Sequence, residues 1–462
     1  MTREPQRTAL YRTIWRWHFY AGLLVLPLVA VLALTGAVYL FKPQLDAWEE
    51  RAFTGMADHG SVLPDTQVAA ALAAYPGARF HAYRLPLREG DAALVHLGLP
   101  GGHAMRDVFV SPQGRVLGTL DPQARIAQVA HDIHGQLLMG RRGSWLVELT
   151  ASWAIVLIAS GLYLWWPTGR GMAGVVWPRL NGGRRVFWRD LHAVTGFWVS
   201  GLALVLLFTG LPWADAWGSA FKALRTEMGW VNGPQAWTIG GHAPDAADDD
   251  PHAGHDHAAM MAMGPAAVMP HQHTGGPAPL SLSEIVAEAK SRHLAFPVMI
   301  VPPGAPQAFG GKPRAEWTVR SDTQNRPLAI TLRFDPMTGA ETARETFAQK
   351  HPIDRIVGYG VAWHEGALFG LANQLIGLAT ALMLVTLAVS GFVMWRRRKP
   401  VGTLGAPPLP STPPRIAGIT VLLGLFALVL PLLALSLLAL AVLELLVLRR
   451  IPPLARWLGL AH

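Results

Sequence analysis

The sequence contains no cysteine. This absence excludes disulfide bonds, iron–sulfur clusters, thiolate zinc sites, thiol nucleophiles and covalently attached c-type haem. Charge is also scarce, because Asp, Glu, Lys and Arg make up 15% of the 462 residues, whereas a soluble domain has about 25%. The sequence has neither a P-loop nor a glycine-rich dinucleotide motif, so we expect no fused NAD(P)H or flavin domain. These absences argue against a soluble cytosolic enzyme.

Hydrophobic residues account for 51% of the chain and gather in five runs. Each run is long enough to cross a bilayer, which takes about 20 residues. The first run follows several arginines, as a signal peptide does, but it exceeds an h-region of about 7–15 residues and lacks an A-x-A-like exit, so we expect a retained anchor. The five predicted spans are 19–41, 145–166, 193–213, 366–395 and 416–448.

The fifth run, 416–448, carries Pro431 near its middle. We favour a single kinked and tilted helix. The alternative is a hairpin of two short helices, which would return the tail 449–462 to the side from which the run began. Each half of such a hairpin would be marginal for a full span.

The charges outside the spans are divided unequally. The short segments 1–18, 167–192, 396–415 and 449–462 are basic and contain only two acidic residues. The long loops, 42–144 and 214–365, hold more acidic than basic residues. The positive-inside rule then places the short segments in the cytoplasm and the long loops in the periplasm of a bacterial inner-membrane protein. The net charge of +9 is therefore a topology signal, and we expect no nucleic-acid partner.

The chain repeats itself in its spacing. The first and third spans share one pattern, and the second and fourth spans share another. In the first pattern His18, Gly22 and Thr35-Gly36 correspond to His192, Gly196 and Thr209-Gly210, and in the second His134, Gly140, Ser160-Gly161 and Trp165 correspond to His364, Gly370, Ser390-Gly391 and Trp395. The repeat indicates a span–domain–span unit used twice.

Both long loops have the pattern of a small α+β domain. In the first loop a helix-like segment at 65–75 precedes alternating runs near 80–85, 93–97 and 107–110. In the second loop a helix-like segment at 283–293 precedes runs at 297–301, 316–320 and 329–334. We also expect an amphipathic helix within 214–240. The predicted fold is a membrane α-helical bundle of four core transmembrane helices plus a C-terminal hydrophobic helix or hairpin, with two small periplasmic α+β domains.

Four repeated histidines are the strongest functional signal. His18 and His192 lie at the cytoplasmic ends of their spans, whereas His134 and His364 lie at the periplasmic ends. Ionisable groups at membrane depth are costly and mark functional sites, and imidazole is a good iron ligand. We therefore predict two bis-histidine haems, which must be b-type because cysteine is absent. His131, one turn before His134, is an alternative ligand.

Arginines near the four histidines are candidates for contacts with haem propionates. Arg141 and Arg142 follow His134 and place it on a helix that would extend beyond the bilayer surface. At the cytoplasmic side the candidates are Arg16, Arg184, Arg185 and Arg189. Cytoplasmic topology or headgroup contact explains each of these arginines equally well.

These motifs resemble the PepSY-associated transmembrane family. The resemblance covers roughly residues 10–400, and the two periplasmic domains resemble PepSY modules. The residues that carry it are Arg16-Trp17-His18 with Thr35-Gly36, His134 leading to Ser160-Gly-Leu-Tyr-Leu-Trp-Trp166, Asp190-Leu191-His192 with Thr209-Gly210, and Trp363-His364-Glu365-Gly366 leading to Ser390-Gly-Phe-Val-Met-Trp395. The resemblance implies a haem-b electron conduit and, as in iron-regulated membrane proteins, an inner-membrane reductase of ferric siderophores.

A low-complexity insert at 242–277 interrupts the second loop. Its composition predicts a segment without a packed core. Imidazole together with thioether favours copper, although zinc or nickel could bind the histidines alone, and the segment could equally be only a linker. The candidate ligands are His252, His255, His257, His271, His273, Met260, Met261, Met263 and Met269.

The expected function is transfer of electrons across the bilayer to a periplasmic metal complex, with a ferric siderophore as the leading substrate. A cytoplasmic flavoprotein or ferredoxin, or quinol in the membrane, would supply the electrons. Two alternatives remain open on the sequence alone. One is a metal- or peptide-binding accessory protein without redox activity, and the other is a PepSY-type regulator or inhibitor of a protease.

Overall fold

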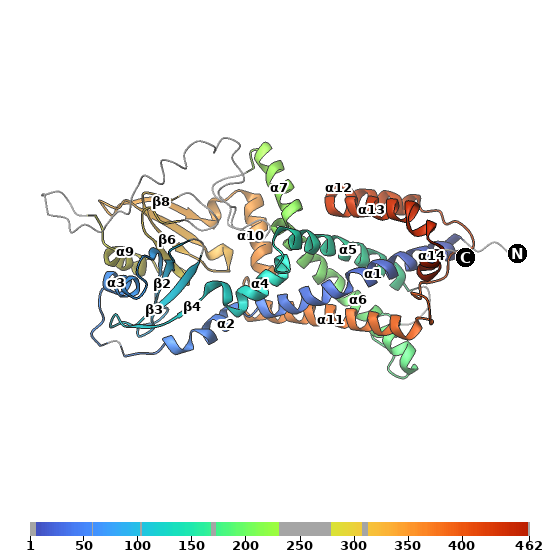
Figure 1. Cartoon of the computed structure of the whole chain (residues 1–462), viewed down its shortest axis with the longest axis horizontal. Coiled ribbons are helices and arrows are strands. Elements are labelled where there is room, and N and C mark those ends of the chain that lie inside the picture. The colour runs from blue at the N-terminus through green and yellow to red at the C-terminus, as the bar shows by residue number, and fades with distance from the viewer. Residues whose placement is uncertain are drawn as a thin grey trace.

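The computed structural model describes residues 6–57, 59–101, 104–167, 172–230, 279–306 and 313–460. A bundle of long helices forms one half of the molecule and a sheet domain forms the other, with the first and last described residues, Gln6 and Leu460, at the end of the bundle far from the sheet (Figure 1). Within the described residues, five helices are long and apolar enough to cross a membrane. The His/Met-rich insert predicted at 242–277 lies outside the described residues.

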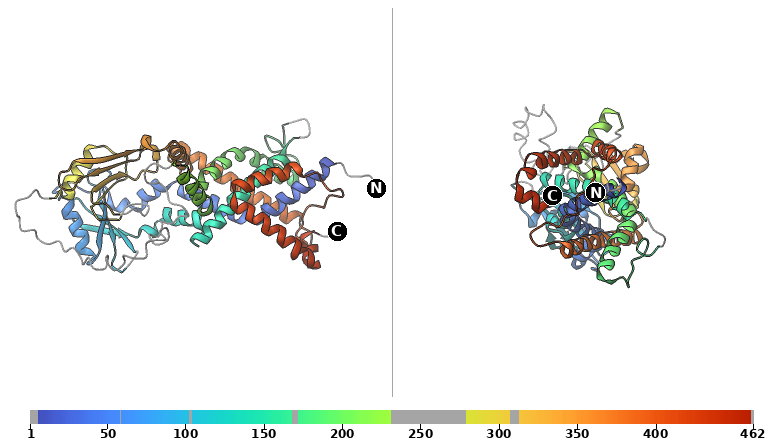
Figure 2. Two further views of the ribbon diagram at one scale, coloured as in Figure 1. Left: turned by 90° about the horizontal axis from the view of Figure 1, so that it is seen from above. Right: turned by 90° about the vertical axis from the view of Figure 1, so that its right-hand side faces the viewer.

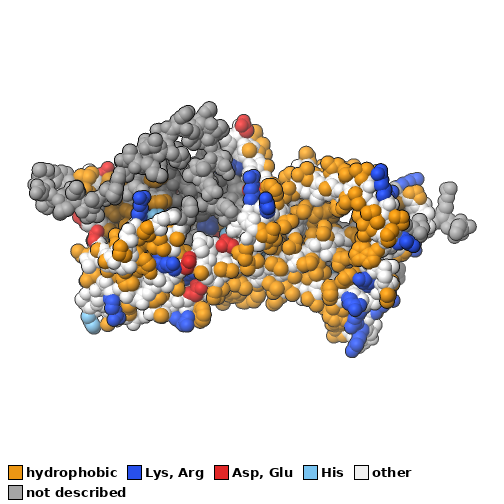
Figure 3. Space-filling view, viewed as in Figure 1, with side chains coloured by type: hydrophobic (Ala, Val, Ile, Leu, Met, Phe, Trp, Pro, Cys, Tyr) orange, Lys and Arg blue, Asp and Glu red, His pale blue; other side chains and the backbone are white. Residues whose placement is uncertain are grey.

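Four long helices form the core of the bundle. α1 packs against both α5 and α11, and α6 packs against the same two helices, which closes a four-helix ring. An apolar helix satisfies its own backbone hydrogen bonds, which makes it stable in lipid. Large apolar side chains such as Leu24 and Trp198 remain exposed on the outside of the ring, and Figure 3 shows a broad hydrophobic surface over this half. The helices are α1 (Gln6–Tyr39), α5 (Arg141–Trp165), α6 (Gly183–Gly210) and α11 (Leu371–Arg398).

Two short helices precede the second and fourth spans. α4 (Ile126–Gln136) packs against α1 and α5, and α10 (Pro352–His364) packs against α6. Gly140 (φ 60, ψ −141) separates α4 from α5, and Gly370 (φ 58, ψ −137) precedes α11. This backbone region is essentially restricted to glycine, which explains why the repeat contains glycine at both positions. His134 therefore lies on a separate helix folded back on the bundle, and its predicted place on an extension of the second span is wrong.

The strands of the two long loops form one eight-stranded sheet rather than two separate domains. The strand order is β4-β3-β2-β1-β5-β6-β7-β8, and all pairs are antiparallel. The two loops join at the centre, where Tyr83 of β1 pairs with Ile300 of β5. The strands are β1 (Arg79–Arg84), β2 (Ala93–Gly98), β3 (Met105–Val110), β4 (Val116–Leu120), β5 (Val298–Val301), β6 (Trp317–Ser321), β7 (Ile330–Phe334) and β8 (Glu341–Thr346).

This join corrects the expectation of two small α+β domains, because the core runs across it. Val95, Val108, Ile300 and Leu332 are fully buried in one cluster under α3 (Pro64–Ala74) and α9 (Leu282–Ser291). The two helices are also joined, since the Asp65 carboxylate accepts hydrogen bonds from backbone N–H groups in the first turn of α9. The strands β4 and β8 and the helices α4 and α10 were not predicted.

The C-terminal hydrophobic run is a hairpin, so the preferred single helix is wrong. α12 (Ala417–Val429) and α13 (Pro431–Leu446) meet at a bend and run back from it, diverging as a V when seen from above (Figure 2). Leu430 between them is non-helical (ψ 88), as expected for a residue before proline. The hairpin brings α14 (Pro452–Leu458) beside the start of α1, where Arg16 donates a hydrogen bond to the Gly459 carbonyl (2.9 Å).

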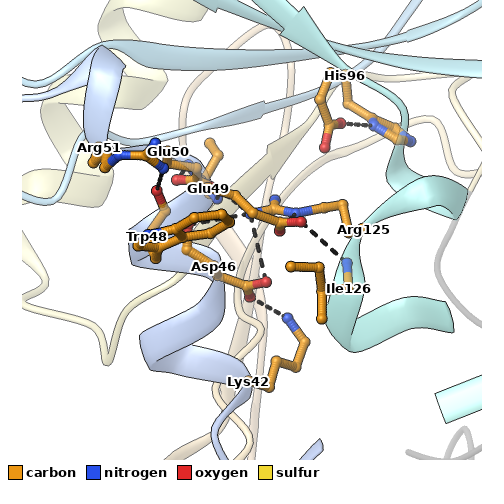
Figure 4. A network of polar contacts seen from close by, with 11 residues as sticks. Lys42, Asp46, Trp48, Glu49, Glu50, Arg51, His96, Arg125 and Ile126 are labelled. Carbon is orange, nitrogen blue, oxygen red and sulfur yellow. Dashed lines mark hydrogen bonds and ion pairs between the residues drawn. The ribbon is translucent and has the colours of Figure 1, made fainter. Parts of the chain in front are cut away.

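A network of ion pairs connects the bundle to the sheet domain. α2 (Lys42–Glu49) follows α1 directly and presents carboxylates to two arginines (Figure 4). Arg125, just before α4, binds Glu49 (3.1 Å) and Glu50 (2.8 Å). Glu50 also binds Arg84 of β1 (2.6 Å). The network thereby ties α1, α4 and the sheet to one another.

Candidate functional site

The structure brings the four repeated histidines together as two facing pairs. His18 of α1 and His192 of α6 have ring centres 6.5 Å apart and planes at 86°, at the end of the bundle far from the sheet. We call them the sheet-distal pair. His134 of α4 and His364 of α10 have ring centres 6.2 Å apart and planes at 74°. His134 packs against Gly36 of α1, which follows His18 by 18 residues. At 1.5 Å per helical residue, this sheet-proximal pair lies about 25 Å from the sheet-distal pair along α1.

Each ring of the sheet-distal pair is oriented by a serine. His18 Nδ1 lies 2.9 Å from Ser160 Oγ of α5, and His192 Nδ1 lies 3.0 Å from Ser390 Oγ of α11. Both hydroxyls donate their own proton to a carbonyl of their helix. They can therefore only accept from the rings, which places the proton of each ring on Nδ1.

The sheet-proximal pair is oriented in the same way. His134 Nδ1 donates to the Leu32 carbonyl of α1 (2.9 Å). His364 Nδ1 lies 3.1 Å from Thr209 Oγ1, whose hydroxyl is a donor to the Val205 carbonyl of its own helix. Burial lowers the pKa of His134 and His364 to about 4, so both rings are neutral at pH 7. In all four histidines the unprotonated Nε2 remains available as a ligand.

The repeated glycines are the surfaces on which the rings pack. A Cβ atom at Gly36 would lie 3.0 Å from His134 Cε1, and one at Gly210 would lie 3.2 Å from His364 Cε1. At the other pair, a Cβ at Gly161 would lie 3.3 Å from His18 Cε1. Each Thr-Gly or Ser-Gly pair thus supplies a hydroxyl for Nδ1 and an open space for the ring edge. The sequence pattern indicated the glycines but not the role of the hydroxyls.

One continuous cavity of about 1970 Å³ connects the two pairs, and all four histidines line it. A pocket for one drug-sized ligand is about 300–1,000 Å³, so the cavity has room for more than one such ligand. Apolar residues of the four core helices form most of its wall, including Leu26, Val199 and Leu384. The cavity therefore combines two neutral nitrogen donor pairs with an apolar interior.

The residues present fit two bis-histidine haems. A metal–imidazole bond is about 2 Å long, so two imidazole rings whose centres lie about 6 Å apart leave room for one metal ion that both would hold. The observed separations are 6.5 Å and 6.2 Å. Neutral rings with Nδ1 held by a carbonyl or hydroxyl are the form that binds metal.

The geometry selects His134 over His131 as the partner of His364. His131 Nδ1 binds Asp132 instead (3.2 Å), and its ring contacts Tyr39 at 5.4 Å between centres. His131 still lines the cavity beside the pair. It therefore lies near the site without facing the second ring.

The arginines predicted to contact propionates lie in different places. Arg184 and Arg185 line the sheet-distal end of the cavity, whereas Arg16 donates a hydrogen bond to the Gly459 carbonyl. Arg141 binds Asp215 at the start of α7 (Asp215–Glu227) at 2.9 Å, and neither Arg141 nor Arg142 lines the cavity. Arg189 does line it, at the sheet-distal end, where it also binds Asp190 (2.8 Å). Arg326 of the sheet domain lines the cavity at the other end and was not predicted.

Fold and site together define a multi-pass membrane protein whose helical bundle encloses two facing histidine pairs and carries an extramembrane β-sheet. A family model described as the PepSY-associated TM region matches residues 15–398. The chain therefore belongs to the PepSY-associated transmembrane family. No curated protein matches the chain.

Proposed function

We propose that this protein is a transmembrane haem-b oxidoreductase of the bacterial inner membrane. In this proposal it passes electrons from the cytoplasmic side, or from quinol, to a periplasmic metal complex, with a ferric siderophore as the leading substrate. The observation that carries the proposal is the pair of neutral, facing histidines at each end of one transmembrane cavity. Bound haem iron would supply one-electron redox chemistry at each end.

The charge distribution supports the orientation. Arginines are concentrated at the sheet-distal end, including Arg184, Arg185, Arg397 and Arg398 around the cavity, and Figure 3 shows Lys and Arg clustered there. The positive-inside rule assigns that end to the cytoplasm and the sheet to the periplasm. The exposed Arg184 and Arg185 would also attract an acidic electron donor such as a flavoprotein or ferredoxin.

The roles of the protein residues follow from their contacts. His18 and His192 would hold one haem near the donor side, and His134 and His364 would hold the other near the sheet. Ser160, Ser390, Thr209 and the Leu32 carbonyl hold the rings through Nδ1, which leaves Nε2 as the nitrogen that would bind iron. One electron delivered to the periplasmic face reduces the Fe(III) of the substrate to Fe(II), and the donor is oxidised by one electron.

The proposal is tested with purified protein whose haem has been reduced and separated from excess reductant. A ferric hydroxamate siderophore is added, and loss of the reduced haem band is followed together with trapping of Fe(II) by a ferrous chelator. We expect reoxidation with one Fe(II) trapped per electron lost. The gallium(III) complex of the same siderophore is the control, because it has the same shape and is not reduced. Equal reoxidation rates with the two complexes would contradict the proposal.

A further inference from the structure

A single arginine from the sheet domain reaches the sheet-proximal end of the cavity. Arg326 begins the short turn of 3-10 helix Arg326–Leu328, which connects β6 to β7 and packs against α10. Its side chain lines the cavity together with Tyr39, His131 and Glu365. Its guanidinium pairs with Glu365 (3.4 Å), the residue that directly follows His364 of the sheet-proximal pair.

The hydrogen bonds of Arg326 are incomplete. Its Nε is buried and has no partner among the residues that the structure describes. Its Nη2 lies 3.4 and 3.5 Å from the two carboxylate oxygens of Glu365, whereas a charge-assisted pair is about 2.7–2.9 Å long. A guanidinium has five donors in a fixed planar fork and leaving them unpaired in a buried place is costly. The geometry therefore has room for an anionic partner.

The other arginines around the described cavity belong to its opposite end. Arg179, Arg184, Arg185 and Arg189 precede or begin α6, and Arg397 and Arg398 end α11. Those two helix ends lie beside His18 and His192. Among the described arginines around the cavity, Arg326 is thus the one positioned to bind an anion near His134 and His364.

We propose that Arg326 binds a carboxylate of the sheet-proximal haem, namely one of its propionates. This inference rests on the proposed function, because it assumes that His134 and His364 hold a haem. An arginine binds a carboxylate through two parallel N–H···O bonds, and the unpaired Nε with one adjacent Nη provides that fork. Arg326 takes the role that the sequence suggested for Arg141 and Arg142, which do not line the cavity.

The assignment gives the sheet domain a part in holding the cofactor. Arg326 belongs to the connection between strands β6 and β7 of the sheet, whereas the two histidines come from short helices packed on the bundle. A propionate held by Arg326 would join the two parts of the molecule at the site where the substrate takes up its electron. The sheet-distal site has no counterpart from the sheet domain, because it lies at the opposite end of the bundle.

The experiment uses full-length chains that bind one haem each. His192→Ala leaves only the sheet-proximal site, and His364→Ala leaves only the sheet-distal site. Arg326→Gln is introduced into both, and haem release to apomyoglobin is timed. We expect Arg326→Gln to speed release about 10-fold or more from the sheet-proximal site, as loss of an outer contact does at metal sites, with no change at the sheet-distal site. Arg320→Gln in β6 is the matched control, since Arg320 pairs with Asp322 on the sheet.

A second measurement does not depend on the folding of one variant. The apo form of the His192→Ala chain is titrated with haem and with haem dimethyl ester, which lacks both carboxylates. With Arg326 present we expect the ester to bind at least 10-fold more weakly than haem. In Arg326→Gln the affinity difference between haem and its ester should disappear. The two ligands and the two variants form a thermodynamic cycle that isolates the interaction between the arginine and the carboxylate.

The outcomes separate the two proposals. An ester penalty of the same size with and without Arg326, or unchanged haem release in Arg326→Gln, overturns the propionate assignment while leaving the oxidoreductase standing. Absence of haem from the unmodified chain overturns the oxidoreductase itself. Faster release from both sites in Arg326→Gln would show a general loss of structure and would also count against the assignment.

Discussion

The hydroxyl groups opposite the histidines set what each ring can bind. Ser160, Ser390 and Thr209 give their own proton to a helix carbonyl and accept the Nδ1 proton of a histidine. A ring held in this way has a fixed orientation and a free Nε2. The repeated Ser-Gly and Thr-Gly pairs are therefore parts of the site, in addition to their place in helix packing.

The first prediction concerns this hydrogen bond. Ser390→Ala should weaken haem binding at the sheet-distal site about 10-fold, because His192 loses the group that orients its Nδ1. The rate of haem release from the His364→Ala chain measures the effect. Thr386→Ala on the same helix is the control, since the Thr386 hydroxyl binds only its own helix at the Leu382 carbonyl. Equal effects of the two substitutions would show that the serine has no particular role.

The second prediction concerns the space beside the rings. Gly210→Val should displace His364, because a Cβ at Gly210 already lies 3.2 Å from His364 Cε1. The haem content should fall from two towards one per chain, with the sheet-proximal haem lost. Gly201→Val on the same helix should leave both haems in place, since among the described residues no atom outside its own helix lies within 4 Å of a Cβ at that position. If Gly210→Val retained two haems, the ring would not need this space.

At the scale of elements, α4 and α10 bring two of the four histidines into the bundle. Each is a short helix that ends before a glycine with positive φ, and the next span begins immediately afterwards. Arg125 holds the start of α4 against the carboxylates of α2 (Figure 4). The position of His134 therefore depends on an ion-pair network that is remote from the site.

The third prediction tests this dependence. Arg125→Gln should lower stability by about 3 kcal/mol, because the largely buried Glu49 carboxylate loses its guanidinium and keeps the Ile126 backbone N–H, whereas Glu50 keeps Arg84. Thermal unfolding of the detergent-solubilised protein should shift downwards, and the sheet-proximal haem should be released faster. Arg344→Gln is the control, since Arg344 forms an exposed pair with Glu341 and should change stability by about 0.5 kcal/mol or less. A shift no larger than that of the control would contradict a role for the network.

The sequence was informative where the signal was local and incomplete where it depended on distant contacts. The histidine pairs could be proposed because matching spacing places His18 with His192 and His134 with His364 at the same depth. The separate helices α4 and α10 could not be predicted, because the hydrophobic pattern does not distinguish a short amphipathic helix from the long apolar run beside it. Arg326 could not be predicted either, because its place beside the cavity arises from packing between a sheet connection and α10.

At the scale of the whole molecule, the two long loops cooperate in one sheet and the C-terminal run folds back. The central β1–β5 pair and the shared core explain why the two modules are not independent. The hairpin is held in place by α5, since Leu433 is fully buried and Trp153 donates a hydrogen bond to Ser436 Oγ (3.2 Å). Its consequence is that α14 and the start of α1 share one end of the molecule.

The fourth prediction follows from this topology. A cysteine placed at Arg456 of α14 should lie on the opposite side of the membrane from one placed at Glu89 of the sheet domain. The natural absence of cysteine makes single-site labelling straightforward. In spheroplasts, whose inner membrane is intact, a membrane-impermeant maleimide should label Glu89→Cys. It should label Arg456→Cys only after lysis. Labelling of both in intact spheroplasts would support a single C-terminal span instead.

The measurement that tests the central claim most directly is the number of haems per chain. It combines a reduced-minus-oxidised spectrum of the purified protein from haem-replete cells with a pyridine haemochrome assay. The account predicts two b haems per chain, with one remaining in His192→Ala and one in His364→Ala. A well-folded protein without haem, or a haem content unaffected by both substitutions, would contradict it.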